Sequence, residues 1–329
     1  MESAPASSSM KSLGRSVVTF VACGLLLYAG LYYAAEQLMR STGRSNAFFK
    51  IATMEQPAVD WVILGASHAM PLDFDGFNAL MERDTGLRIA NLASPGTGPL
   101  YNRFVLEHYL REHRTRNLLY VVDSFAFYSR AWNEERFADP KLLARTPRDP
   151  AIAARLWQYV RHEGVDPRAL LDYATGFSKI NNRDRFKTDV WEGEAQFERA
   201  WRPSASAVKK RIEYLYPDRT PAAVLDRYMG EFSQLLELAR QAGARVTVVK
   251  LPAPPGYRSQ LPAEAQFDEA ILRVSAKHGV AMRDFSTAIA EPRSYFDTDH
   301  LNRAGLTEFF NKYLKGLLMD SAPARDDGA

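Results

Sequence analysis

Cysteine is almost absent from this 329-residue chain, and neither sign of charge is in large excess. The one cysteine, Cys23, lies inside an apolar N-terminal stretch, so no disulfide can form within the chain. The 42 basic and 39 acidic side chains give a formal net charge of +3 at pH 7, which offers no electrostatic reason to expect a nucleic-acid partner. We find no internal repeat, low-complexity block or known nucleic-acid-binding motif.

Histidine spacings typical of metal sites are also missing. Four of the six histidines are scattered over helix-like segments without the close spacing of metal ligands: His108, His113, His162 and His278. The sequence therefore predicts no structural or catalytic metal and no cofactor.

A long uncharged run stands near the N-terminus. Val17–Ala35 contains no charged residue and is rich in Leu, Val, Ala, Gly and Tyr. A run of about 18 or more apolar residues can span a bilayer, whereas a cleavable signal has an apolar region of about 7–15. We therefore predict a cytoplasmic tail over residues 1–16, a transmembrane anchor over residues 17–35 and a polar linker over residues 36–57. A removed signal peptide is the alternative.

The flanks of this run suggest an orientation. Three tyrosines cluster toward its far end, as in an interfacial aromatic belt: Tyr28, Tyr32 and Tyr33. Basic residues lie on both sides, so their bias is small. The segment before the apolar run is short and the part after it is large. This favours a single-pass protein of the inner (cell) membrane, with the large C-terminal body on the periplasmic, extracytoplasmic side. A cytoplasm-facing lipid esterase is the alternative topology.

Strand-like and helix-like segments alternate through the rest of the chain. The apolar, β-branched segments expected as strands are Val59–Leu64, Arg88–Leu92, Leu118–Val122, Arg245–Leu251 and Val280–Phe285. The segments expected as helices are Phe74–Arg83, Leu100–His113, Pro221–Ala242, Pro262–His278 and Arg303–Leu318. This alternation predicts an α/β fold with a parallel sheet between two helical layers over residues 58–319, because parallel strands need crossover connections. The polar tail over residues 320–329 is expected to be disordered.

The alternation breaks over residues 125–219. This stretch carries many charges, short helix-like pieces and four of the five tryptophans, with no persuasive strand. We predict a mainly helical insertion near the carboxyl ends of the strands, where open α/β sheets bind ligands. Trp191 and Trp201, with Arg202, Lys209, Lys210 and Arg211, are candidates for a sugar-stacking or anionic-polymer groove. Core packing of a lid is the alternative.

Two short segments carry the residues of a serine acyl-transfer site. Ser67 comes directly after the first expected strand, and Asp297 stands three residues before His300, just ahead of the last expected helix. A serine hydroxyl becomes a good nucleophile when an imidazole takes its proton, and a carboxylate holds that imidazole in the required tautomer. An α/β-hydrolase elbow is the competing interpretation of Gly65-Ala66-Ser67-His68-Ala69, but in that fold several strands precede the serine.

These segments resemble the SGNH (GDSL-like) hydrolase superfamily. The stretch Asp297–Gly305 reproduces the family's Asp-x-x-His-x-Asn-x-x-Gly spacing. The resemblance implies a three-layer, flavodoxin-like α/β/α fold, with Ser67 as nucleophile, His300 as general base and then acid, and Asp297 as orienting carboxylate. Asp299 is the alternative for that last role.

Two further segments of the chain correspond to family segments, one closely and the other with a substitution. In Asn91–Gly96 a strand-end asparagine is followed five residues later by a glycine, and the resemblance implies that the N–H groups of Gly96 and Ser67 line an oxyanion hole. Gly98 is a substitute if the loop is shifted, and a plain Pro-Gly turn is the alternative. The family's Gly-x-Asn-Asp segment is replaced by Asp123-Ser124-Phe125, so the Ser124 hydroxyl is the expected third donor.

The substrate and partners follow from the same resemblance. The predicted substrate-binding residues are His68, Asn91, Trp191 and Trp201, although His68 has a structural loop role as its alternative. The single anchor and extracytoplasmic body are similar to the membrane-anchored DltD-like and AlgJ/AlgX-like acyl-modifying branch. This implies a serine esterase or O-acyltransferase acting on acyl, above all acetyl, groups of an extracytoplasmic glycan, with a membrane-bound O-acyltransferase as a candidate partner. The alternative is a catalytically degenerate domain that binds glycan or partners such an acyltransferase.

Overall fold

The computed structural model describes residues 6–320, with side chains from residue 12 onward. The tail predicted to be disordered lies outside the described residues apart from Asp320, as do the first five residues of the predicted cytoplasmic tail.

A five-stranded, entirely parallel sheet forms the centre of the body, in the order β2-β1-β3-β4-β5. The strands are β1 (Ala58–Leu64), β2 (Ile89–Asn91), β3 (Arg114–Val121), β4 (Arg245–Lys250) and β5 (Ala281–Asp284). In the register, Ile63 lies beside Asn91 on one side and Leu119 on the other. The predicted parallel α/β fold is confirmed.

Alternating side chains of the central strands supply two separate cores. Val62 and Leu64 of β1 belong to one apolar cluster, and Trp61 and Ile63 belong to the other, because successive strand residues point to opposite faces. The first cluster includes buried residues of α4 (Pro99–Glu112), α10 (Ala222–Gln241) and α12 (Glu264–Lys277). The second includes residues of α3 (Phe77–Thr85), α13 (Arg303–Phe309) and α14 (Lys315–Asp320), with a π-helical turn over Phe310–Leu314. The result is the predicted three-layer arrangement.

The insertion after β3 is helical throughout its regular elements, as expected. Its members are η2 (Ser124–Phe127), η3 (Arg130–Trp132), η4 (Glu134–Ala138), α5 (Pro140–Arg145), α6 (Pro150–His162), α7 (Pro167–Thr175), α8 (Phe177–Ile180), η5 (Glu194–Gln196) and α9 (Ala205–Leu215). Two short elements follow later in the body: α11 (Pro255–Arg258) and η6 (Pro292–Ser294).

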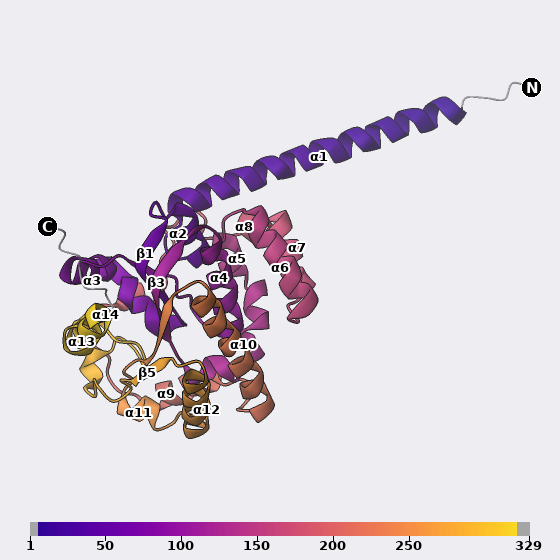
Figure 1. Cartoon of the computed structure of the whole chain (residues 1–329). Coiled ribbons are helices and arrows are strands. Elements are labelled where there is room, and N and C mark those ends of the chain that lie inside the picture. Colours follow the sequence, from indigo (N-terminus) through magenta and orange to yellow (C-terminus); the bar gives the residue numbers. More distant parts are fainter. Residues whose placement is uncertain (1–5, 321–329) are drawn as a thin grey trace, which may run out of the picture.

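The N-terminal helix α1 (Ala6–Thr42) projects away from the body, and its C-terminal part rests beside α8 (Figure 1). Its 31 residues over Ser12–Thr42 are long and apolar enough to cross a membrane. The expectation of a polar linker over residues 36–57 is wrong as a description of local structure, because α1 continues to Thr42 and α2 (Ala47–Thr53) follows. Met39, Phe48 and Ile51 are buried there, which shows that apolar side chains pack this stretch against the body.

Candidate active site

Ser67 begins a 3₁₀ segment, η1 (Ser67–Gly76), directly beyond the carboxyl end of β1. Gly65 makes this sharp exit feasible, because its φ of +150° is a conformation that side-chain-bearing residues rarely adopt. A Cβ at Gly65 would also stand 2.8 Å from the Val121 carbonyl oxygen of the neighbouring strand. The glycine therefore fixes where the serine leaves the sheet.

His300 and Asp297 lie in the loop that leads into α13. Asn302 closes this loop: its side chain accepts from Gly305 N at 2.9 Å and donates to the Arg293 carbonyl at 2.7 Å. Asp297 Oδ1 accepts from the backbone N–H of His300 at 2.9 Å, which holds the carboxylate beside its own histidine. The family-like spacing thus corresponds to a compact, internally bonded turn.

The structure brings the three predicted residues into one hydrogen-bonded line. Ser67 Oγ lies 2.9 Å from His300 Nε2, and His300 Nδ1 lies 2.9 Å from Asp297 Oδ1 and 3.0 Å from Oδ2. Ser67 and His300 are 4% and 1% exposed. In this arrangement the imidazole can take the serine proton on one nitrogen while the carboxylate holds the other.

Asp299 has a different set of partners. Both of its oxygens face Arg211, with Nη2 2.8 Å from Oδ2 and Nε 3.1 Å from Oδ1. Its distance of 3.5 Å to His300 Nδ1 is longer than that of Asp297. The Asp299 carboxylate is fully buried, and Arg211 and His300 hold its pKa well below the usual range against the opposing effect of burial. Arg211, predicted to line an anionic-polymer groove, is instead committed to this buried pair.

His68 forms a second histidine–carboxylate pair beside the line. Its Nδ1 bonds to Asp123, and its Nε2 lies 3.2 Å from Asp299 Oδ2. Burial lowers the pKa of His68, but the two carboxylates outweigh burial and raise it to about 10. The ring is therefore an imidazolium at neutral pH, sandwiched between two carboxylates and 4.7 Å from the His300 ring.

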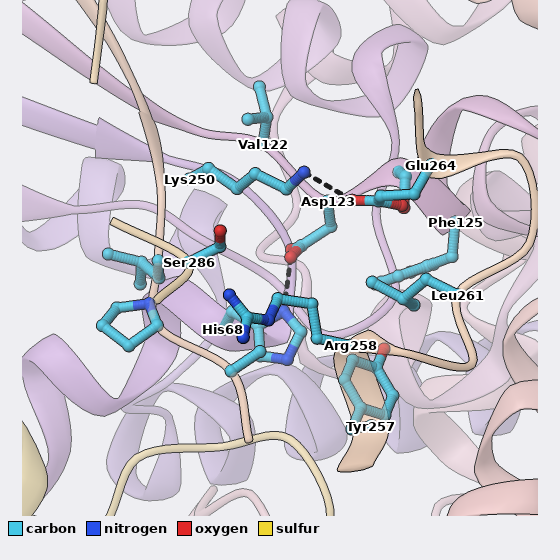
Figure 2. Close-up of a pocket in the computed structure, with 14 residues that line it drawn as sticks. His68, Val122, Asp123, Phe125, Lys250, Tyr257, Arg258, Leu261, Glu264 and Ser286 are labelled. Carbon is cyan, nitrogen blue, oxygen red and sulfur yellow. Dashed lines mark hydrogen bonds and ion pairs between the residues drawn. The ribbon is translucent and has the colours of Figure 1, made fainter. Parts of the chain in front are cut away.

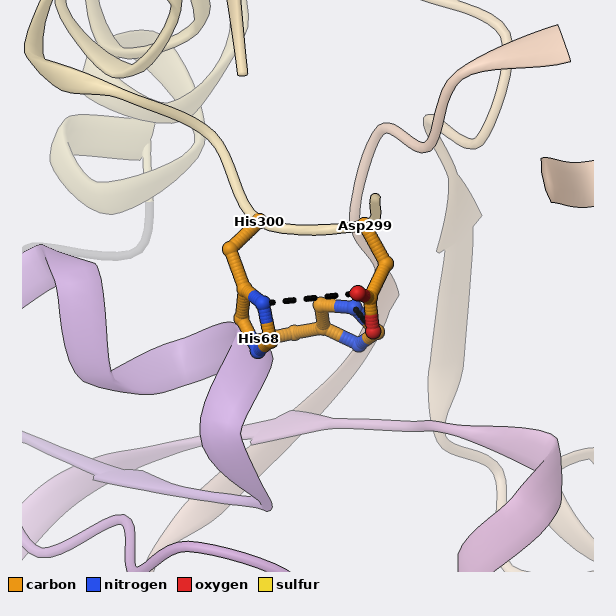
Figure 3. Close-up of side chains that lie close together, drawn as sticks. All are labelled: His68, Asp299 and His300. Carbon is orange, nitrogen blue, oxygen red and sulfur yellow. Dashed lines mark ion pairs between the residues drawn. The ribbon is translucent and has the colours of Figure 1, made fainter. Parts of the chain in front are cut away.

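His68, Asp299 and His300 lie close enough together to suggest a metal site (Figure 3), since one ligand atom of each falls within 4.8 Å of the others. Their partners do not fit a cation. The Arg211 guanidinium donates to the Asp299 carboxylate, and the His68 ring is protonated. His300 Nε2 is directed at Ser67. Metal ligation requires neutral imidazoles and free carboxylate lone pairs, so we interpret the group as an ion-pair network.

The loop expected to supply the oxyanion hole is tied to the serine turn. Thr97 Oγ1 donates to the Gly65 carbonyl at 3.1 Å, and Ser94 N donates to the same oxygen at 3.3 Å. Gly96 has φ +60° and packs against the Trp132 ring, where a Cβ would come within 2.8 Å. The insertion thus supports this loop from outside, a contact that the sequence analysis did not predict.

Two predicted site side chains are engaged elsewhere. The Ser124 hydroxyl bonds to Glu264 and lies 2.7 Å from the Tyr216 hydroxyl, so it is committed as a donor away from Ser67. The Asn91 amide donates to Ala69 O at 2.8 Å and accepts from Ala93 N at 3.0 Å. Asn91 therefore links β2 to η1 rather than presenting its side chain to a ligand.

A cavity of about 650 Å³ lies beside the site and is bounded largely by the insertion. Its wall includes Ser94 and Pro95 of the predicted oxyanion loop, together with Trp191, Arg136 and Tyr214. The Trp191 ring stands 5.2 Å from the His300 ring, at the boundary between the cavity and the histidine. Of the two predicted tryptophans, Trp191 is thus next to the site, whereas Trp201 packs against the first core cluster.

A second, water-sized cavity of about 30 Å³ is lined in part by His68 (Figure 2). Asp123 and His68 form one wall, and Lys250 pairs with Glu264 at 2.6 Å on another. No sequence motif indicated this cluster, because its members come from four separate parts of the chain.

Comparisons with known proteins find solved structures of low sequence identity to this chain. No family model and no curated protein matches the chain. A Bacteroides fragilis protein, named by inference as an acylhydrolase, is 9% identical with a TM-score of 0.41, covering 84% of this chain and 95% of that one. A GDSL-like lipase from Bacteroides thetaiotaomicron is 7% identical with a TM-score of 0.41, covering 83% and 95%.

Proposed function

We propose that the chain is an SGNH-type serine esterase or O-acyltransferase, anchored in the membrane by α1. The observation that carries this proposal is the line from Ser67 through His300 to Asp297, with both hydrogen bonds at 2.9 Å. Burial of the serine and histidine supports it, because electrostatic interactions are stronger where water is excluded.

The geometry supports a two-step reaction. Ser67 Oγ attacks the ester carbonyl carbon while its proton passes to His300 Nε2. The tetrahedral intermediate then collapses, the bond to the leaving oxygen breaks, and His300 returns the proton to that oxygen. In the second step a water or sugar hydroxyl gives its proton to His300 Nε2 and attacks the acyl carbon. The bond from that carbon to Ser67 Oγ then breaks and His300 returns the proton to Oγ, which releases the carboxylic acid or the acylated sugar. Asp297 stabilises the imidazolium in both steps.

The charge of Asp123 is compatible with this reaction. A lone carboxylate at the end of β3 would oppose a developing oxyanion. His68 carries a compensating positive charge directly bonded to Asp123, so the pair is close to neutral. We propose the N–H groups of Ser67 and Gly96 as the oxyanion donors, each worth on the order of 3 kcal/mol.

We further propose acyl, chiefly acetyl, groups of an extracytoplasmic glycan as the substrate, with the body on the periplasmic side and a membrane-bound O-acyltransferase as a candidate partner. The support is the 650 Å³ cavity, whose wall mixes charged groups with Trp191 and Tyr214. Such a wall suits a polyhydroxylated ligand better than a hydrocarbon chain, because hydroxyls need polar partners and sugar faces stack on aromatic rings.

The test uses the detergent-solubilised chain, an activated acetyl ester and a fluorophosphonate probe. We expect acetate release and labelling by the wild type, and a fall in kcat of about 10⁴-fold or more for Ser67→Ala. Ser259→Ala, at an exposed serine, is the matched control. Equal rates for Ser67→Ala and wild type would remove Ser67 from the mechanism. A chain that binds glycan but is not labelled would indicate the degenerate binding domain instead.

A further inference from the structure

Exposed apolar side chains gather where the insertion meets α1. Leu171 on α7 is 64% exposed and Phe177 on α8 is 61% exposed. Ala174, one helical turn after Leu171, is exposed as well. We call these three residues the apolar corner. Figure 1 shows α8 directly beside the lower part of α1.

The same corner is bonded to α1 at defined points. The Tyr28 hydroxyl donates to the Thr175 carbonyl at 3.1 Å, and the Tyr32 hydroxyl donates to the Tyr173 carbonyl at 3.4 Å. Gly176, with φ +71°, lies against the Tyr32 ring so closely that a Cβ would stand 2.6 Å from it. The corner therefore has a fixed position along the helix.

That position falls within the depth of a bilayer. Arg15 is the last charged residue before the apolar run, and a hydrocarbon core of about 30 Å takes up roughly 20 helical residues. Such a core, starting just after Arg15, would end near Ala35. Tyr28 would then lie about 10 Å on the membrane side of that edge. The turn that accepts its hydrogen bond must be at a similar level.

Two charged groups near the corner are turned inward, whereas Arg168, one turn before Leu171, is exposed. Lys179 is buried, bonds to Glu36 of α1 and donates to the Thr146 carbonyl at 2.7 Å. Asp172 accepts from Ser178 Oγ at 2.6 Å. The side chains left facing outward at Leu171, Ala174 and Phe177 are apolar, as at a surface that contacts lipid.

We propose that the apolar corner is a membrane-docking surface, which enters the interfacial region of the same bilayer that α1 spans. The proposal rests on the membrane anchoring proposed above. Docking at a second point beside the anchor would stop the body from swinging about α1. It would also hold the 650 Å³ cavity at a constant height above the membrane, since Ser45 and Asn46, between α1 and α2, form part of its wall.

The depth of single positions tests this directly. Cys23 is replaced by Ala, and one cysteine is introduced at a time into the full chain: Leu171→Cys, Phe177→Cys, Leu26→Cys and Phe186→Cys. Each is labelled with an environment-sensitive fluorophore in phosphatidylcholine–phosphatidylglycerol vesicles. Quenching is then measured with lipids spin-labelled in the acyl chain and with aqueous iodide.

Two positions serve as matched references. Leu26, 74% exposed on α1, reports the anchor itself. Phe186 is equally exposed at 74%, but its neighbour Arg185 contacts Thr42, about 21 Å further along the helix axis than Tyr28. We expect at least twofold quenching by spin-labelled lipid at Leu26, Leu171 and Phe177, and several-fold stronger iodide quenching at Phe186.

The outcomes separate the two proposals. Lipid quenching at Leu26 together with iodide quenching at Leu171 and Phe177, as strong as at Phe186, would overturn docking and leave the anchor intact. Iodide quenching at Leu26 would overturn the anchor and docking with it. Esterase activity of each labelled variant, measured in the same vesicles, verifies that the body is folded.

Discussion

The charge of the His68 ring is set by the two carboxylates that contact it. Its pKa of about 10 lies above the ordinary value of 6.5, because Asp123 and Asp299 favour the imidazolium despite burial. A raised pKa in the folded state means that the bound proton stabilises the fold fully below about pH 6.5. That stabilisation is lost as the pH rises through about 10.

Replacing His68 by Gln removes this proton-linked stabilisation. We expect the free energy of unfolding of the wild type to exceed that of His68→Gln by roughly 3–5 kcal/mol at pH 6, with the difference shrinking steadily toward pH 10.5. Urea unfolding followed by tryptophan fluorescence measures it, with the exposed His162→Gln as control. A difference that stays constant across this pH range would contradict the buried imidazolium.

Arg211 and Asp299 form the other charged pair that affects stability, because Asp299 is completely buried. Arg211→Gln leaves that charge without its bidentate partner and should cost roughly 3–5 kcal/mol. The double variant Arg211→Gln/Asp299→Asn should recover at least half of the loss, while Lys210→Gln on the exposed face of α9 should change stability by less than about 0.5 kcal/mol. Equal unfolding midpoints for Arg211→Gln and Lys210→Gln would show that Asp299 does not depend on Arg211.

At the scale of elements, the sequence predicted those parts in which local signals agree with the tertiary structure. The β-branched run Arg245–Leu251 forms β4 over Arg245–Lys250, and α13 begins at Arg303 as expected, with Asn302 as its N-cap. Ser67 and His300 meet because carboxyl ends of parallel strands share one edge of the sheet. Such features depend on periodicity, capping and topology, which a single sequence carries.

The parts that were missed depend on contacts between distant segments. Helix α2 lay in a stretch interpreted as linker, although Phe48 and Ile51 are apolar at helical spacing and pack into the core. The pairing of His68 with Asp123 joins residues 55 positions apart, and Ser124 bonds across 140 positions to Glu264. No local pattern specifies such pairs, because they form only once the chain has folded.

The segment between α8 and α9 covers the candidate site. Its Trp191 contacts the rings of Phe74, Phe296 and His300, at 5.8, 6.4 and 5.2 Å between centroids. Ser67 is only 4% exposed, and we expect this segment to limit how readily an ester reaches the serine. Trp191 is the side chain whose removal should open the path most.

Trp191→Ala should therefore raise the second-order rate of labelling by a bulky fluorophosphonate about tenfold, equivalent to roughly 1.4 kcal/mol of barrier, with less effect on a small one. Parallel time courses with the two probes measure the ratio. Trp157→Ala, at a half-exposed tryptophan on α6, is the control. Slower labelling of Trp191→Ala with both probes would show that the ring binds the ligand rather than covering the site.

At the scale of the whole molecule, the end of α1 is part of the folded body. Ala35 and Met39 are buried, and the Glu36 carboxylate bonds to the buried Lys179 and accepts from Arg148 N at 3.1 Å. Burial lowers the pKa of Lys179, although Glu36 opposes this effect. Without Glu36, the Lys179 ammonium would remain inside the insertion with the Thr146 carbonyl and the Tyr32 ring as partners but with no carboxylate.

Two truncations separate the apolar, exposed part of α1 from this structural part. A chain that begins at Leu31 keeps Tyr32, Glu36 and Met39, whereas a chain that begins at Ser45 loses all three. We expect the free energy of unfolding of the second chain to be roughly 3–5 kcal/mol lower than that of the first, because the second leaves Lys179 buried without its carboxylate. Adding Lys179→Met to the second chain should recover part of the loss, since it removes that stranded charge. Equal urea midpoints for the two truncated chains would show that the end of α1 contributes nothing to the stability of the body.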